Sequence, residues 1–137
     1  MKIENIIGQL VKNYNNPKRR NRTLFLLGPS GVGKSDSIHD AAVQLSAQYG
    51  CAFPVIDKRL SQMEPPDFGG VPSVADGRTV KNVPDWWPTD MKSRGFLLLD
   101  EVTSAPPVMQ AAAYEVALDR SMGGEPLPEG WMVITAG

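Results

Sequence analysis

Eight consecutive residues early in the sequence combine glycines with a lysine and a serine in a pattern that suits phosphate binding: Gly28, Pro29, Ser30, Gly31, Val32, Gly33, Lys34 and Ser35. The glycines permit a tight turn whose backbone N–H groups point inward at an anion. The Lys34 ammonium would reach the terminal phosphates, and the Ser35 hydroxyl would ligate Mg²⁺. A glycine-rich turn that only enters a helix is the structural alternative. The lysine, the serine and both flanking segments favour the polyphosphate site.

An apolar run that ends in two carboxylates supplies the second part of this candidate site. Residues 96–99 are apolar, and Asp100 and Glu101 follow directly. At a strand tip, Asp100 would hold Mg²⁺ through water and Glu101 would polarise an attacking water. Alone, the pattern also fits a strand that ends in a solvated loop. Paired with the phosphate-binding pattern, it predicts Lys34 and Glu101 as catalytic residues and Ser35 and Asp100 as metal ligands.

Helical spacing of apolar residues predicts the elements that flank these groups. The predicted helices are residues 1–14, the segment from the phosphate-binding pattern to Tyr49, and residues 108–120. Gly50 lies where a C-terminal cap is expected, and Gly123 and Gly124 are expected to end the third helix. Ser104, followed by Pro106 and Pro107, is a candidate cap at its start.

Four short apolar segments predict strands at 23–27, 52–57, 96–100 and 131–136. The first is continuously apolar, as is typical of a strand that is buried on both faces. Pro54 cannot donate a backbone hydrogen bond, so we expect its strand at an edge. Strands that alternate with helices predict an α/β fold with a parallel sheet and right-handed crossovers. Ligands bind at the carboxyl ends of such strands, where Asp100 and the phosphate-binding pattern both fall.

The remaining segments are less informative. Residues 61–95 are rich in proline and glycine, and a loop of this length is either functional or carries short elements of its own. Trp86 and Trp87 within it would pack under the loop or contact a partner. The basic cluster at residues 18–22 is expected to be a solvated loop.

Composition limits the class of protein. The chain has 137 residues, enough for one domain, and its net charge of −1 gives no basic footprint for nucleic acid. The single cysteine, Cys51, offers neither an internal disulfide nor a metal constellation. No apolar stretch approaches the ~20 residues of a membrane span, and the N-terminus lacks the apolar core of a secretion signal. We therefore expect a cytoplasmic protein with no membrane contact.

Five blocks of the sequence together resemble the MoxR-like branch of the AAA+ ATPases over nearly the whole chain. The blocks are Gly28–Ser35, Phe96–Glu101, Ser104–Ala112, Leu127–Trp131 and Val133–Gly137. The first two, the Walker A and Walker B motifs, are shared by all AAA+ proteins. The third, in which Ser-Ala-Pro-Pro opens a helix rich in alanine, is more specific to the MoxR-like branch.

This resemblance implies that residues 1–137 form an AAA+ nucleotide-binding core with the three-layer α/β/α fold of P-loop NTPases. It implies a sheet order of 5-1-4-3-2, ATP and Mg²⁺ as ligands, and a homo-oligomeric ring, usually a hexamer, that remodels a protein partner. Carried over by position, Lys34 and Ser35 bind phosphate and magnesium. Asp100 and Glu101 become the hydrolysis pair.

The sequence stops at Gly137, where the family pattern continues into a polar residue, a fifth strand, an arginine finger and a helical lid. We therefore expect four of the five core strands and an ATPase whose turnover is weak. A nucleotide-binding or assembly module with little or no hydrolysis is the main alternative. A nucleic-acid motor and a small-molecule kinase are further alternatives. The isoelectric point near 5.8 disfavours the motor, and the Asp-Glu strand tip disfavours the kinase.

Overall fold

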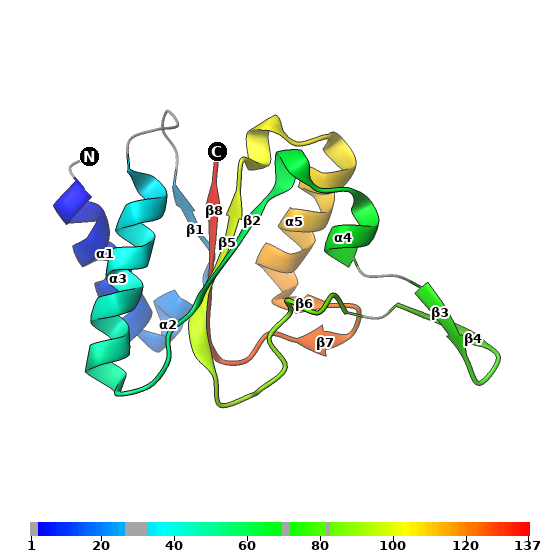
Figure 1. The fold of residues 1–137 in the computed structure, drawn as a ribbon, viewed down its shortest axis with the longest axis horizontal. Coiled ribbons are helices and arrows are strands. Elements are labelled where there is room, and N and C mark those ends of the chain that lie inside the picture. Colours follow the sequence, from blue (N-terminus) through cyan, green and yellow to red (C-terminus); the bar gives the residue numbers. More distant parts are fainter. Residues whose placement is uncertain (1–2, 27–32, 70–71, 82) are drawn as a thin grey trace.

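Parallel strands lie between two layers of helices in the computed structural model, which describes residues 3–26, 33–69, 72–81 and 83–137 (Figure 1). The helices are α1 (Ile3–Asn15), α2 (Pro17–Arg20), α3 (Lys34–Tyr49), α4 (Pro65–Gly69) and α5 (Pro107–Asp119), with 3₁₀ turns η1 (Leu60–Gln62) and η2 (Val102–Ser104). The strands are β1 (Leu24–Leu26), β2 (Val55–Arg59), β3 (Pro72–Ala75), β4 (Arg78–Lys81), β5 (Arg94–Asp100), β6 (Ser121–Met122), β7 (Glu125–Pro126) and β8 (Gly130–Ala136).

The main sheet has the order β1-β8-β5-β2, and every neighbouring pair is parallel. Numbered along the chain, the four strands of this sheet have the order 1-4-3-2. This agrees with the order 5-1-4-3-2 that the resemblance implies, apart from the fifth strand. The prediction that the strand around Pro54 lies at an edge is confirmed. The strand itself begins after Pro54 and continues to Arg59, two residues beyond the predicted end.

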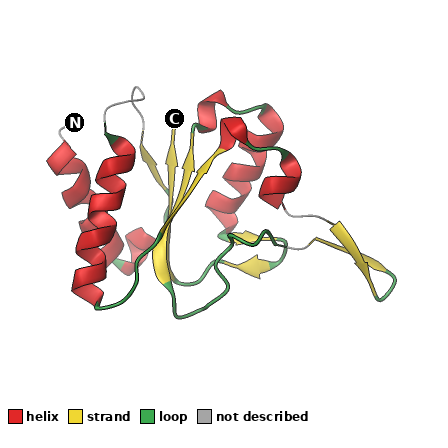
Figure 2. Ribbon diagram, viewed as in Figure 1, coloured by secondary structure: helices red, strands yellow, loops and turns green. Residues whose placement is uncertain are grey.

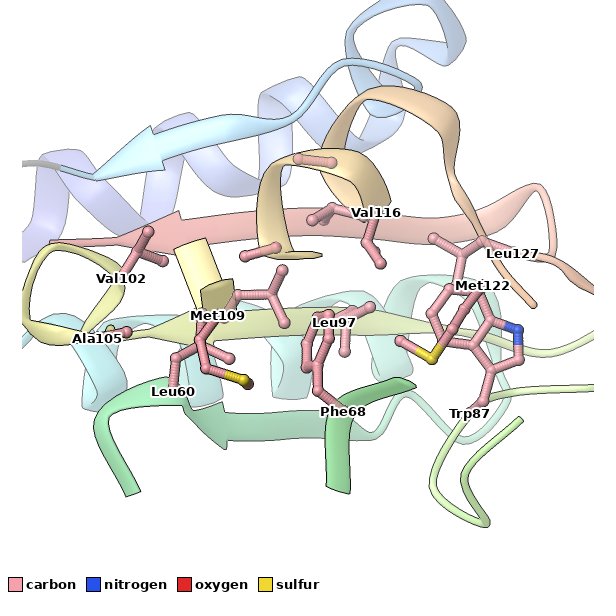
Figure 3. Packing of buried hydrophobic residues seen from close by; sticks show 14 of the residues in the cluster. Leu60, Phe68, Trp87, Leu97, Val102, Ala105, Met109, Val116, Met122 and Leu127 are labelled. Carbon is pink, nitrogen blue, oxygen red and sulfur yellow. The ribbon is translucent and has the colours of Figure 1, made fainter. Parts of the chain in front are cut away.

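Alternation along the central strands divides the apolar residues between two cores. Phe96 and Leu98 point toward α1 and α3, where they pack with residues such as Leu10 and Leu45. Leu97 points to the opposite side, where it packs with residues of α4 and α5 such as Phe68 and Met109 (Figure 3). Leu99 belongs to the same core. The helices on either side of the strands complete a three-layer α/β/α arrangement, as expected (Figure 2).

A tyrosine at the end of α1 ties this helix to the sheet. The Tyr14 hydroxyl donates to the Gly130 carbonyl oxygen at 2.7 Å and accepts from the Arg94 guanidinium at 3.0 Å. The Arg20 Nε donates to the Tyr14 carbonyl oxygen at 2.9 Å, and its guanidinium lies 4.4 Å from the Tyr14 ring centroid. The expectation of a solvated basic loop is therefore wrong for Arg20, which is buried in α2, although Lys18 remains exposed.

Three further expectations differ from the structure. Phe25 in β1 is 54% exposed, so this strand is not buried on both faces; Phe25 adjoins Tyr114 and Leu118 of α5, which are exposed themselves. Ser104 lies in η2 and does not cap α5, whose N-cap position is Pro106. Arg120, with φ of 52°, ends α5 in place of the glycines, which form the turn between β6 and β7.

Residues 61–95 carry short elements, one of the two predicted outcomes. The β3–β4 hairpin turns at Asp76 and Gly77, which both have positive φ, the backbone pattern of a type I′ turn. Trp87 is buried in the core beside α4, and Trp86 packs against the same cluster, which favours packing over partner contact for this pair. Within the described residues, no helix has the length and apolar character needed to cross a bilayer.

Candidate functional site

A cleft of about 370 Å³ lies where the carboxyl ends of β5 and β8 meet the N-terminus of α3. In a parallel sheet, every strand ends and every crossover helix begins at the same edge, so the ends of β5 and β8 lie near the start of α3. The lining residues are Gly33, Lys34, Ser35, Asp36, Ile38, Arg59, Leu98, Asp100, Glu101, Ala136 and Gly137.

The cleft brings together the predicted site residues that the structure describes. Lys34 and Ser35 line it from the first turn of α3, and Asp100 and Glu101 line it from the end of β5. Gly33 precedes the helix with φ of 78°, a left-handed conformation that glycine adopts without a steric penalty. The predicted residues Gly28, Pro29, Ser30, Gly31 and Val32 lie outside the described residues.

The start of α3 offers positive charge to the cleft. Helix N-termini carry unpaired backbone N–H groups and the positive end of the helix dipole, which together attract anions. The Lys34 Nζ donates to the Gly137 carbonyl oxygen at 3.2 Å, so the ammonium spans from α3 to the end of β8. Polyphosphate oxygens could replace this carbonyl as acceptors for the same ammonium.

The opposite wall carries two carboxylates that are held in place locally. The Asp100 Oδ1 accepts the Glu101 backbone N–H at 2.8 Å. Glu101 itself has φ of 57°, a left-handed conformation that is costly for a residue with a Cβ. Backbone strain of this kind clusters at functional sites.

The Glu101 carboxylate has a partner on each oxygen. The Ser61 hydroxyl donates to Oε2, and the Arg59 Nε lies 3.8 Å from Oε1. Neither partner was identified from the sequence. The predicted strand ended at residue 57, which hid the fact that Arg59 pairs with Asp100 in the register of β2 and β5. A strand of the correct length would have placed Arg59 at the carboxyl edge of the sheet, beside the site.

A third carboxyl group, Asp57, lies close enough to influence the charge of the cleft. Partial burial raises the pKa of Asp57 above its ordinary value of 3.8, and the negative charge of Asp100 acts in the same direction. Arg59 and His39 act in the opposite direction. Charges of both signs around the cleft therefore act on Asp57.

The donors on the two walls fit a magnesium ion that also binds phosphate. Ser35 and Asp100 offer a hydroxyl and a carboxylate oxygen, the hard ligands that Mg²⁺ prefers. The described residues contain no cluster of three His, Cys, Asp or Glu side chains that could hold a metal alone. A magnesium ion here would therefore depend on water and phosphate oxygens as well, as is usual for Mg²⁺ bound to nucleotides.

No family model matches the chain, and no curated protein matches it. Because a fold alone does not determine function, the function has to be inferred from the chemistry of the cleft and from the sequence blocks that form it.

Proposed function

We propose that the chain binds ATP with Mg²⁺ and hydrolyses it, as the nucleotide-binding core of a MoxR-like AAA+ ATPase that remodels a protein partner. One observation carries the proposal: Lys34 and Ser35 at the start of α3 line the same cleft as Asp100 and Glu101 at the end of β5, at the carboxyl edge of the sheet. This is the arrangement that a P-loop NTPase needs, since a phosphate-binding wall and an acidic wall must lie on either side of the same phosphates.

The wall formed by α3 supplies the binding energy for phosphate. The Lys34 ammonium and the first-turn N–H groups of α3 present positive charge to the cleft, and charge-assisted hydrogen bonds to phosphate are about twice as strong as neutral ones. Ser35 and Asp100 would hold Mg²⁺. When bound, Mg²⁺ neutralises charge on the β- and γ-phosphates.

Glu101 is the candidate for orienting the attacking water. Its carboxylate would accept a hydrogen bond from the water, whose oxygen forms a bond to the γ-phosphorus as the bond to the β,γ-bridging oxygen breaks. The electron pair of the broken bond leaves with ADP, and the water proton passes to Glu101 and then to solvent. Lys34 stabilises the negative charge on the transferring phosphoryl group.

The coupling to a protein partner is supported by the resemblance in the sequence blocks. The Ser104–Ala112 block runs from the last residue of η2 into α5, and η2 itself begins directly after Glu101. A change in the position of Glu101 would therefore be passed to α5 through a short connection. The same resemblance supports a ring-shaped homo-oligomer as the assembly in which the chain acts.

Substitution of Glu101 tests the hydrolytic role. We expect Glu101→Gln to retain ATP binding and to slow phosphate release by about 10²–10⁴-fold, because the amide cannot accept the water proton. Phosphate release under single-turnover conditions, with bound ATP measured in parallel, gives both quantities. Glu115→Gln, an exposed glutamate of α5, is the matched control. Unchanged phosphate release in Glu101→Gln would remove Glu101 from the mechanism.

A nucleotide-binding module without hydrolysis is the second candidate. It is favoured by the engagement of both Glu101 carboxylate oxygens, by Ser61 and by Arg59, which leaves the carboxylate less available to water. ATP binding by the unsubstituted chain with no phosphate release above background would support this candidate over the ATPase.

A further inference from the structure

We infer that Arg59 is a second cation of the phosphate site and contacts the terminal phosphate of ATP, exchanging its ion pair with Glu101 for phosphate oxygens. This inference rests on the proposed function, because it requires a nucleoside triphosphate in the cleft. It adds a residue that neither the phosphate-binding pattern nor the acidic pair contains.

The strand geometry places Arg59 on the correct face of the sheet. Val55 packs in the core on the α1–α3 side, so alternation along β2 directs Arg59 to that side as well. Phe96 and Leu98 fix the same orientation for Asp100 on β5. Arg59 pairs with Asp100 in the parallel register and lines the same cleft as Lys34.

Charge in the cleft supports a role for this guanidinium. Among the described lining residues, Lys34 and Arg59 carry the positive charges, and they lie on different elements, α3 and β2. A polyphosphate in the cleft would therefore meet one cation from each of these two elements. Arginine also presents its N–H donors as a planar fork that matches phosphate oxygens, which lysine cannot do.

The present partner of Arg59 binds it weakly. The Arg59 Nε and the Glu101 Oε1 are 3.8 Å apart, and the two side chains are 52% and 37% exposed. Exposed ion pairs of this length contribute little to stability. A bound phosphate group with two short charge-assisted hydrogen bonds would compete successfully for the same guanidinium.

The position of Glu101 identifies which phosphate Arg59 contacts. Under the proposed function, Glu101 orients the water that attacks the γ-phosphate, and Arg59 adjoins Glu101. Arg59 is therefore placed to approach the γ-phosphate from β2, whereas Lys34 approaches the phosphates from the first turn of α3. Transfer of Arg59 to the phosphate would also free one Glu101 oxygen to accept from water.

Nucleotide titrations in a Glu101→Gln background separate a direct contact from an effect through Glu101. The full chain carrying Glu101→Gln is compared with the double variant Glu101→Gln/Arg59→Ala, using MgATP and MgADP as probes. We expect Arg59→Ala to weaken MgATP binding by about 10- to 100-fold, the loss typical of a charged hydrogen-bonding partner, and MgADP binding by less than about threefold. In the same Glu101→Gln background, Arg59→Lys should retain only part of the MgATP affinity that Arg59→Ala loses.

Each outcome of this experiment decides the inference. Equal losses for MgATP and MgADP, or no loss for either, would overturn it while leaving the proposed function intact. Failure of the Glu101→Gln chain to bind either nucleotide would overturn the proposed function itself and this inference with it. Arg78→Ala, on the β3–β4 hairpin, is the control for loss of an exposed arginine, and circular dichroism verifies that each variant is folded.

Discussion

At the scale of single residues, Glu101 combines backbone strain with side-chain restraint. Its left-handed backbone costs about 1–3 kcal/mol, which the hydrogen bond from its N–H to the Asp100 carboxylate partly offsets. Ser61 of η1 donates a hydrogen bond to the carboxylate, and Arg59 of β2 forms a weak ion pair with it. The orientation of the proposed water-activating group is therefore set by two adjacent strand ends, so that movement of either end would change it.

Asp57 provides a prediction for the pH dependence of stability. Because the pKa of Asp57 is raised in the folded chain, the folded state binds this proton more tightly than the unfolded state does. The contribution of Asp57 to the free energy of unfolding therefore falls as the pH rises above 3.8 and through the raised pKa. We expect Asp57→Asn to be more stable than the unsubstituted chain at pH 7, and the difference to shrink as the pH falls toward 3.8.

Urea unfolding at several pH values measures this difference. Asp85→Asn, at an exposed aspartate, serves as the control. A variant Asp57→Asn that is less stable than the unsubstituted chain at pH 7, or a difference that does not change with pH, would contradict the electrostatic account of this group.

At the scale of elements, the site depends on the junction that holds α5 against β8. The half-buried Arg120 guanidinium donates to the Trp131 carbonyl oxygen at 2.7 Å and to the Pro128 carbonyl oxygen at 3.4 Å. Burial lowers the pKa of Arg120 below its ordinary value. This arginine therefore links the end of α5 to the segment that leads into β8, the strand that forms one side of the cleft.

Removal of this link should destabilise the whole fold. We expect Arg120→Ala to lower the free energy of unfolding by about 2–3 kcal/mol, because two partly buried carbonyl groups lose their donor. Arg120→Lys should lose less, since an ammonium can satisfy one of the carbonyls. Urea denaturation measures both, with Asp119→Ala, at the exposed neighbouring position, as the control. An Arg120→Ala chain as stable as the unsubstituted one would show that the junction is held by packing alone.

Elements whose signal lies within a short stretch of sequence could be predicted, whereas features that depend on distant residues or on unusual backbone conformations could not. Helical spacing of apolar residues located α1 and α3, and short apolar runs located β5 and β8, which are buried along most of their length. Glu101 and Arg120 both take left-handed backbone conformations that sequence rules assign to glycine, so neither the turn at Glu101 nor the identity of the residue that caps α5 was predicted, although the helix itself ends within one residue of the predicted end. Arg59 and Ser61 were missed because their role comes from pairing with a strand that lies far along the chain.

At the scale of the whole molecule, one side of the sheet carries an exposed apolar surface. Phe25, Tyr114 and Leu118 are 54%, 41% and 83% exposed, and they line a groove of about 400 Å³ between β1 and α5. No strand in the described part of the chain pairs with the outer edge of β1. An unpaired strand edge next to apolar side chains favours association with another chain.

Self-association of the chain should therefore depend on this surface. We expect Leu118→Lys to weaken association at least about tenfold, because an exposed leucine buried on association contributes about 1.5–3 kcal/mol. Sedimentation velocity over a concentration series measures the change. Val43→Lys replaces an exposed valine of α3, on the other side of the sheet, as the control. Equal association of both variants and the unsubstituted chain would place the contact elsewhere.

The most direct test of the central claim is an equilibrium titration of MgATP into the unsubstituted chain and into Lys34→Ala. If the cleft between α3 and β5 binds the triphosphate, the unsubstituted chain binds MgATP, and Lys34→Ala loses at least about tenfold in affinity because it lacks a charged phosphate contact. Lys92→Ala, at an exposed lysine before β5, should bind as the unsubstituted chain does. MgATP binding with the same affinity in Lys34→Ala, or no binding by the unsubstituted chain, would contradict the account.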